Sequence, residues 1–287
     1  MSGTRLVLLT AASLACFAAN SLLCRAALGR GLVDPASFTL VRIASGAAAL
    51  AALVAVSRRA RPSGGSWASA LALVAYAAAF SLAYVRIGAG VGALLLFGAV
   101  QVSMVGWGAL RGARPGGLAA VGIALALGGL AWLVLPGASA PDPAGAGLML
   151  AAGAAWGAYT LRGRGARDPL ATTAGNFALA LPGALLFSAV LWREAHATAG
   201  GLALAAASGA LASGGGYSLW YAAVPALGAT RAAAVQLSVP VLAGLGATAF
   251  LGERLTPRIA AAGAVILLGI ALTLRRSRWR SQPGRGP

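Results

Sequence analysis

Residues 99–103 read AVQVS and residues 234–238 read AVQLS, and each phrase lies inside a long apolar stretch. The chain has three glutamines, Gln101, Gln236 and Gln282, so two of the three occupy the same place in a repeated phrase. FSLAY at 80–84 likewise pairs with YSLWY at 217–221, an offset of 137 residues (217 minus 80) against 135 (234 minus 99) for the glutamine phrase. The repetition predicts two copies of one structural unit.

The composition is that of a membrane protein. The 287 residues are 59% hydrophobic and 9% charged, with a mean hydropathy of +0.83, whereas a water-soluble domain carries about a quarter charged residues. The net charge of +17 comes from arginines spread between apolar runs, which argues against binding of nucleic acid. All of the basic residues are arginine and none is lysine, a bias that we read as a GC-rich, bacterial coding sequence.

A helix needs about 20 apolar residues to cross a bilayer, and ten segments of this kind follow one another. They lie near 6–26, 36–56, 66–85, 88–110, 116–135, 145–161, 170–192, 200–222, 225–251 and 257–274. We therefore predict an all-α integral membrane protein with a first five-helix repeat at 1–140, a second at 141–275 and a basic cytoplasmic tail at 276–287. Because five is odd, the second repeat enters the membrane inverted, as in many secondary transporters.

The arginines predict the orientation. With a cytoplasmic N-terminus, 14 arginines fall on the inner side and 6 on the outer side. Both termini are then cytoplasmic, and the protein is predicted in the bacterial inner membrane.

The repeated glutamines have two interpretations. An amide inside hydrocarbon needs a partner, so Gln101 and Gln236 either line a transport cavity or form hydrogen bonds that only hold helices together. Pro240 lies four residues after Gln236, where its ring is expected to kink the ninth span and act as a hinge. Aromatic residues at helical spacing are further candidates for the cavity, although such stripes also serve core packing: Tyr76, Phe80, Tyr84, Trp156, Tyr159, Tyr217 and Tyr221.

Residues 224–270, which contain LGERLTP (251–257) before a glycine-spaced last span, resemble the EamA branch of the drug/metabolite transporter superfamily. FAANSLLCR (17–25) resembles the first-span motif and carries Asn20, FTLVRIASGAAAL (38–50) the second-span motif with Arg42, and AWGAYTLRGR (155–164) the sixth span. The resemblance implies a ten-helix inverted-repeat carrier that moves amino acids or other small metabolites, usually outward, through a central cavity. The first repeat has Ala113 where the motif carries glutamate, so Glu253 alone keeps that acid.

The positions of the charged residues indicate which charge the substrate carries. The five acids are predicted at span ends or in loops, so we expect a neutral, zwitterionic or anionic substrate rather than a cation. Arg42 and Arg231 lie slightly inside the second and ninth spans: Arg231 is a candidate partner for a substrate carboxylate or a snorkelling side chain, and Arg42 and Glu253 are expected to have structural or gating roles.

Enzymatic activity is not expected. The single histidine, His196, is predicted in a loop, and no cluster has metal-ligand spacing, so neither a metal nor a cofactor is predicted. The expected partners are a small-molecule substrate and membrane lipid, with the protein a monomer or a homodimer. A channel or sensor remains an alternative, followed by a multidrug efflux carrier and an intramembrane enzyme.

Overall fold

The computed structural model describes residues 2–57, 64–111, 116–137, 140–163 and 166–274. Within these ranges the chain is helical, with one isolated bridge between Val33 and Ala197 and no other strand pairing. The helices are α1 (Gly3–Leu28), α2 (Pro35–Val56), α3 (Trp67–Arg86), α4 (Ala89–Leu110), α5 (Gly117–Val134), α6 (Pro143–Gly163), α7 (Pro169–Val190), η1 (Trp192–Glu194), α8 (Ala199–Ala207), η2 (Ser208–Gly215), α9 (Gly216–Gln236), α10 (Ser238–Leu251) and α11 (Pro257–Leu274).

Short polar side chains and proline fix where several helices begin. Asp34 caps α2 and Asp168 caps α7, each followed by a proline in the first turn, where no intrahelical N–H bond is lost. Ser66 caps α3 through the amide of Ser69. Gly252 ends α10 in the left-handed conformation, with φ of 69°, which glycine adopts without a steric penalty.

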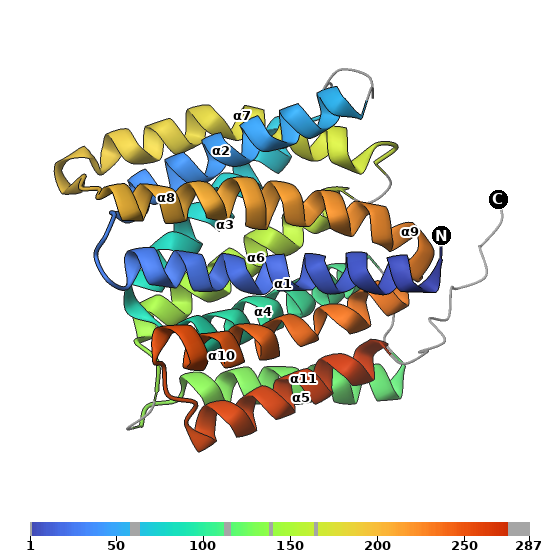
Figure 1. The fold of residues 1–287 in the computed structure, drawn as a ribbon. Coiled ribbons are helices and arrows are strands. Elements are labelled where there is room, and N and C mark those ends of the chain that lie inside the picture. The colour runs from blue at the N-terminus through green and yellow to red at the C-terminus, as the bar shows by residue number, and fades with distance from the viewer. Residues whose placement is uncertain (1, 58–63, 112–115, 138–139, 164–165, 275–287) are drawn as a thin grey trace.

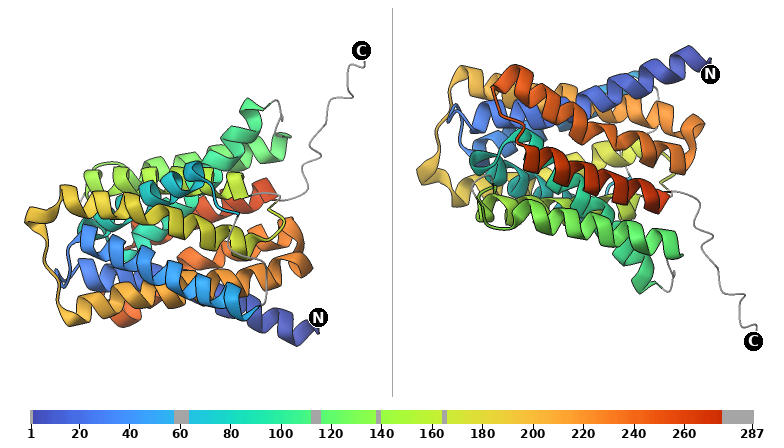
Figure 2. Two further views of the ribbon diagram at one scale, coloured as in Figure 1. Left: turned by 90° about the horizontal axis from the view of Figure 1, so that it is seen from above. Right: turned by 90° about the horizontal axis from the view of Figure 1, so that it is seen from below.

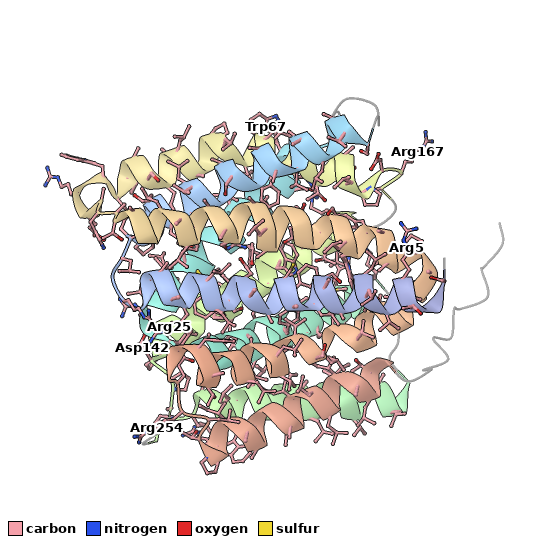
Figure 3. All side chains as sticks on the ribbon, viewed as in Figure 1. Arg5, Arg25, Trp67, Asp142, Arg167 and Arg254 are labelled. Carbon is pink, nitrogen blue, oxygen red and sulfur yellow. The ribbon has the colours of Figure 1, made fainter. Side chains whose placement is uncertain are left out.

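The helices build a multi-pass membrane protein. Six described helices are long and apolar enough to cross a bilayer, namely α1 to α5 and α7. The charged side chains labelled in Figure 3 lie at the two ends of the bundle: Arg5 and Arg167 at one, and Arg25, Asp142 and Arg254 at the other. Large apolar side chains such as Leu186 and Phe250 are exposed on the outer surface, as expected of a surface that faces lipid.

The helices run side by side, and the start of α1 and the end of α11 lie at the same end of the bundle (Figures 1 and 2). α5 packs against α11, α2 against α7, and α4 against α10. α6 packs against α3 and α4, while α1 packs against α8, η2, α9 and α10. The first and second halves of the chain are therefore intermixed, and neither forms a separate lobe.

One predicted boundary is wrong. The sequence predicts a break at 222–225 between the eighth and ninth spans, but α9 runs through Pro225 and ends at Gln236, and Leu237 separates it from α10. A proline can be accommodated in a membrane helix when neighbours satisfy the freed backbone groups. Gln236 is consequently the last residue of a helix rather than the middle of a span. Pro240 lies in the first turn of α10, where it is sterically tolerated.

Asp34 connects the α1–α2 loop to the α7–α8 loop at the end of the bundle away from the start of α1. Its carboxylate accepts hydrogen bonds from the amides of Ala36 (3.0 Å), Ser37 (2.9 Å) and His196 (3.0 Å), and the residue is 2% exposed. Burial acts to raise the pKa of Asp34, but the hydrogen bonds outweigh burial and hold the pKa below its ordinary value. The ionised form is therefore the form that stabilises the α1–α2 and α7–α8 loops.

We expect Asp34→Asn to lower the free energy of unfolding by about 1–2 kcal/mol near neutral pH. Asparagine can accept from Ala36 and Ser37 through its one oxygen, but its NH₂ group then faces the backbone N–H of His196, and two donors cannot bond to each other. A group with a depressed folded-state pKa contributes stability above its unfolded pKa of about 3.9 and loses it as the pH falls. The thermal midpoints of wild type and Asp34→Asn in detergent should therefore converge at acidic pH. A constant difference between pH 7 and pH 3 would contradict this role.

Candidate functional site

Seven aromatic side chains singled out from the sequence form one connected group. The ring of Trp156 on α6 lies 4.9 Å from that of Tyr76 on α3, 5.0 Å from Tyr159 and 5.7 Å from Tyr217 on α9, stacked on the last two. Tyr76, Phe80 and Tyr84 continue along α3 with ring separations of 5.2 and 4.6 Å, and Tyr217 is 6.4 Å from Tyr221. We call these seven residues the aromatic cluster; α3, α6 and α9 all contribute to it.

Further rings, which the helical spacing of aromatic residues does not predict, extend this cluster. Phe17 on α1 lies 5.8 Å from the rings of both Tyr217 and Trp220, and Phe177 on α7 lies 6.2 Å from Tyr217. The ring of Tyr217 is therefore surrounded from α1, α6 and α7. Five helices from both halves of the chain meet at this point.

A chain of polar side chains runs beside the rings. Arg42 Nη2 on α2 donates to the hydroxyl of Tyr76 at 2.9 Å, and Asn20 Nδ2 on α1 donates to the same oxygen at 3.4 Å. Ser208 then donates its hydroxyl hydrogen to Asn20 Oδ1 at 2.7 Å. Arg42, Tyr76, Asn20 and Ser208 are all at most 9% exposed, and we call them the buried polar chain.

Ser208 begins a π-helix, η2, between α8 and α9. This segment packs against α1 and α2, and Gly209 lies against the backbone carbonyl of Arg42. π-helical turns are rare and occur frequently at functional sites. The irregular turn therefore lies directly beside the buried polar chain.

α7 supplies a second set of polar contacts to the cluster. Asn176 Nδ2 donates to the hydroxyl of Tyr159 at 3.3 Å and accepts from the backbone amide of Ser66 through Oδ1 at 2.9 Å. Thr173 Oγ1 is 2.9 Å from the hydroxyl oxygen of Tyr221. The phenol groups of Tyr76, Tyr159 and Tyr221 thus have partners on α1, α2 and α7, and their rings are held in fixed orientations.

The two glutamines are not joined to the buried polar chain by any hydrogen bond among the described residues. Gln101 on α4 and Gln236 at the end of α9 are partly buried, and neither side chain makes a hydrogen bond to another described residue. Arg231 belongs to α9, but its side chain lies outside the described part of the structure. The role of these three residues at a substrate site stays a prediction.

Glu253, which follows α10, contacts α1 and α4 at the end of the bundle opposite the start of α1. Its carboxylate accepts both from Arg25 Nε on α1, at 3.2 Å, and from the amide of Ala89 that begins α4, at 3.0 and 2.8 Å. Arg25 Nη1 also donates to the carbonyl of Tyr84 at 2.8 Å, near the end of α3. An acid at a helix N-terminus and a cation at a helix C-terminus are both favourable placements. We call Arg25 and Glu253 the end clamp.

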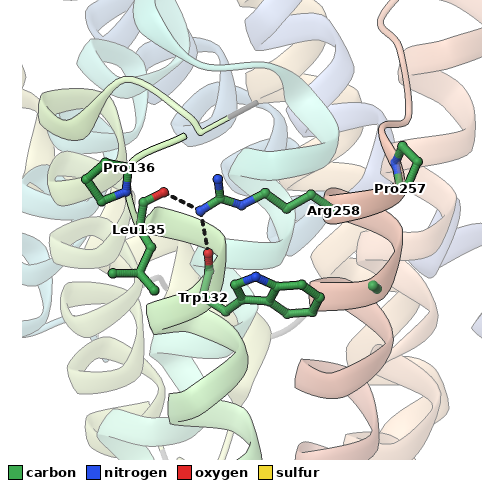
Figure 4. A pocket seen from close by; sticks show the side chains of 6 residues that line it. Trp132, Leu135, Pro136, Pro257 and Arg258 are labelled. Carbon is green, nitrogen blue, oxygen red and sulfur yellow. Dashed lines mark hydrogen bonds between the residues drawn. The ribbon is translucent and has the colours of Figure 1, made fainter. Parts of the chain in front are cut away.

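A cavity of about 520 Å³ lies apart from the cluster, between the ends of α5 and α11 (Figure 4). Arg258 donates there to the carbonyls of Trp132, at 2.6 Å, and Leu135, which end α5. This contact caps a helix C-terminus. None of the residues predicted as a site lines this cavity.

Comparison with known proteins places the chain in a family. Residues 143–275 match the EamA-like transporter family. The chain is 55% identical over 275 residues to an uncharacterized protein of Pseudomonas aeruginosa, covering 96% of each chain, and 27% identical over 258 residues to the uncharacterized transporter YwfM of Bacillus subtilis, covering 85% of this chain and 86% of YwfM.

The fold also recurs among solved structures. A protein of known crystal structure superposes with a TM-score of 0.61 at 18% sequence identity, over 92% of this chain and 97% of the other. At this level of identity the match shows a shared fold. The family match, the similarity to a transporter and the apolar helices agree with one another: the chain belongs to the EamA-like transporter family of the drug/metabolite transporter superfamily.

Proposed function

We propose that the protein is a secondary transporter, and an exporter, of small metabolites such as amino acids, which it moves by alternating access through a central site between two inverted repeats. The observation that carries this proposal is the meeting of the aromatic cluster and the buried polar chain. α1, α2 and α3 of the first half and α6, η2 and α9 of the second half all contribute side chains. In inverted-repeat carriers the substrate site lies at such an interface.

The packing of the helices supports the inverted repeat. If a pseudo-two-fold axis relates the two proposed repeats, it exchanges equivalent helices: α1 with α6, α2 with α7, α3 with the α8–α9 segment, α4 with α10 and α5 with α11. Under this exchange the contacts of α6 with α3 and α4 become those of α1 with the α8–α9 segment and with α10, and both sets are present. The contacts α2·α7, α4·α10 and α5·α11 map onto themselves. With α8, η2 and α9 counted as one passage, the helices of the described residues are compatible with the proposed ten passages, and the family match at 143–275 falls within the proposed second repeat.

The proposed substrate site comprises the aromatic cluster and Asn20, with Gln101, Gln236 and Arg231 completing it in other conformations of the cycle. Pro240 is the proposed hinge, since it follows the break at Leu237 between α9 and α10. Small conformational changes at such a break would alter how α10 packs on α1 and α4. We propose that the end clamp closes the outer end of the site and that it opens once per cycle.

The proposed setting is the bacterial inner membrane, with both termini in the cytoplasm. Arg5 and Arg167, two of the arginines assigned to the inner side, lie at the end of the bundle where α1 begins and α11 ends (Figure 3). The end clamp then faces the outside.

The test of this function is counterflow in proteoliposomes. Proteoliposomes that contain the purified protein are loaded with unlabelled amino acids. Labelled amino acids and one labelled lipophilic cation are then added outside, one at a time, with and without a pH gradient. We expect saturable uptake of at least one amino acid, stimulated by the unlabelled compound on the far side. Non-saturating flux without this stimulation would favour a channel, and a flat panel from folded protein would contradict the proposal.

The glutamines are tested in the same assay. We expect Gln101→Ala and Gln236→Ala to reduce uptake on the order of tenfold, because a polar substrate group would lose a partner worth about 1–3 kcal/mol. Gln282→Ala is the matched control, since Gln282 belongs to the tail beyond the second repeat. Full activity in both single variants would confine these glutamines to a packing role.

A further inference from the structure

Arg42 is a cation buried in the middle of the protein. It lies in the third turn of α2, is 2% exposed, and is among the largest fully buried side chains of the described residues. A guanidinium group carries five N–H donors and remains charged in proteins. Only Nη2 donates to a described group, the hydroxyl of Tyr76 at 2.9 Å, while Nε and Nη1 are buried without a hydrogen-bond partner among the described residues.

No described carboxylate balances this charge. Asp34 caps the same helix eight residues earlier, about 12 Å along the axis, and its oxygens accept from backbone amides at the loop. Glu253 is occupied by Arg25 and the amide of Ala89. The side chain that Arg42 contacts by a hydrogen bond, Tyr76, is a phenol and not a carboxylate.

The surroundings compensate for the charge only in part. The guanidinium carbon lies 5.1 Å from the ring centroid of Tyr76 and 5.0 Å from that of Phe80, so cation–π attraction contributes. Burying a cation without a counter-charge is nevertheless unfavourable, and natural buried charges are normally paired. A methionine or glutamine of similar length would fill the same space without that penalty.

We propose that Arg42 is the anion-binding residue of the substrate site and that the substrate carries a carboxylate, which Arg42 binds when the site opens. This inference rests on the proposed transport function and names the substrate class for it. The planar guanidinium matches the geometry of a carboxylate. The hydroxyl of Tyr76 and the amide of Asn20 lie next to it in the buried polar chain, and Trp156 packs on Tyr76 to receive the apolar part of the substrate.

Arg42 then has the role, partner of a substrate carboxylate, for which Arg231 is a candidate from its place in the sequence. This role also gives a physical reason for keeping an unpaired charge in the interior: the charge is paired in the loaded state and unpaired in the empty one. Removing it is then expected to weaken binding without weakening the fold. A residue with a purely structural role would show the opposite pattern.

The test is ligand-induced thermal stabilisation of the purified protein in detergent, which needs no transport. The probes are acetate, propionate and benzoate, each compared with its neutral amide, and inorganic phosphate distinguishes a carboxylate from a general oxyanion site. We expect wild type to be stabilised by the carboxylates more than by the amides or phosphate. Arg42→Gln should lose at least tenfold in apparent affinity for the carboxylates while its ligand-free midpoint stays equal or rises.

Two further variants make the result specific. Arg42→Lys keeps the charge without the planar fork and should retain part of the carboxylate response. Arg162→Gln removes an arginine whose Nε donates to Ser69 near the end of α6, and it should respond as wild type does.

The inference is overturned if wild type shows no preference for carboxylates over amides, or if Arg42→Gln binds them normally and melts at a lower temperature. A stronger response to phosphate than to carboxylates would also overturn it as stated. Failure of the transport function alone would look different: the carboxylate response and its dependence on Arg42 would persist while counterflow stayed flat.

Discussion

Glu253→Gln is expected to raise, by about tenfold, the rate at which a membrane-impermeant maleimide labels Cys24. The carboxylate of Glu253 joins Arg25 on α1 to the first amide of α4. Glutamine keeps an oxygen for the amide but loses the charge-assisted bond to Arg25. Hydrogen bonds to charged groups contribute about 1.5–3 kcal/mol, and 1.4 kcal/mol already changes an open population tenfold.

The chain supplies its own reporter for this experiment. It has two cysteines, Cys16 and Cys24, and Cys24, beside Arg25, is 0% exposed in the clamped state. In a Cys16→Ala background, labelling of Cys24 therefore measures opening of that end of the bundle. Glu194→Gln is the matched control, because Glu194 is exposed in η1 and outside the end clamp. Equal labelling rates in Glu253→Gln and Glu194→Gln would refute the gating role.

Trp156→Ala is expected to abolish measurable counterflow and to lower stability more than any other substitution considered. Trp156 stacks on Tyr159 and Tyr217 with interplanar angles of 19° and 18° and also touches Tyr76. Truncating a packed tryptophan to alanine costs about 3–5 kcal/mol through lost contacts and the cavity that remains. The rings that it separates would lose their fixed positions.

Loss of folding and loss of binding are separated by a conservative variant. Trp156→Phe keeps a ring between Tyr76 and Tyr217, so we expect the thermal midpoint to recover largely while the affinity for substrate stays reduced. Trp67→Ala is the control, since Trp67 is 61% exposed at the start of α3 and lies on the outside of the bundle (Figure 3). Normal counterflow in folded Trp156→Ala would remove the aromatic cluster from the substrate site.

Much of the fold follows from the sequence because apolar length is a strong signal in a membrane protein. The aromatic stripes at 76, 80 and 84 and at 217 and 221 also identify faces that meet, since residues four apart share a helix face. The sequence does not predict the break at Leu237, because Pro225 has the signature of a helix boundary and the neighbours that let a helix continue through proline come from other parts of the chain.

The buried polar chain was harder to predict. The sequence predicts Arg42 slightly inside its span, whereas α2 begins at Pro35 and Arg42 lies in its third turn, against Tyr76. Ser208, Thr173 and Asn176 carry only the weak signal of a polar residue in an apolar run, and their partners lie far away in sequence. The glutamine phrase identified the repeat, whereas the side chains of Gln101 and Gln236 do not join the cluster by any described hydrogen bond.

The most direct test of alternating access is whether one buried position is reached from both sides of the membrane. Ser208→Cys in a Cys16→Ala, Cys24→Ala background places a single thiol in the buried polar chain, where Ser208 is 0% exposed. With an impermeant maleimide on oriented vesicles, we expect labelling from each side in turn, shifted by Glu253→Gln toward the side of the end clamp. Labelling from one side only, in wild-type and Glu253→Gln backgrounds alike, would contradict alternating access.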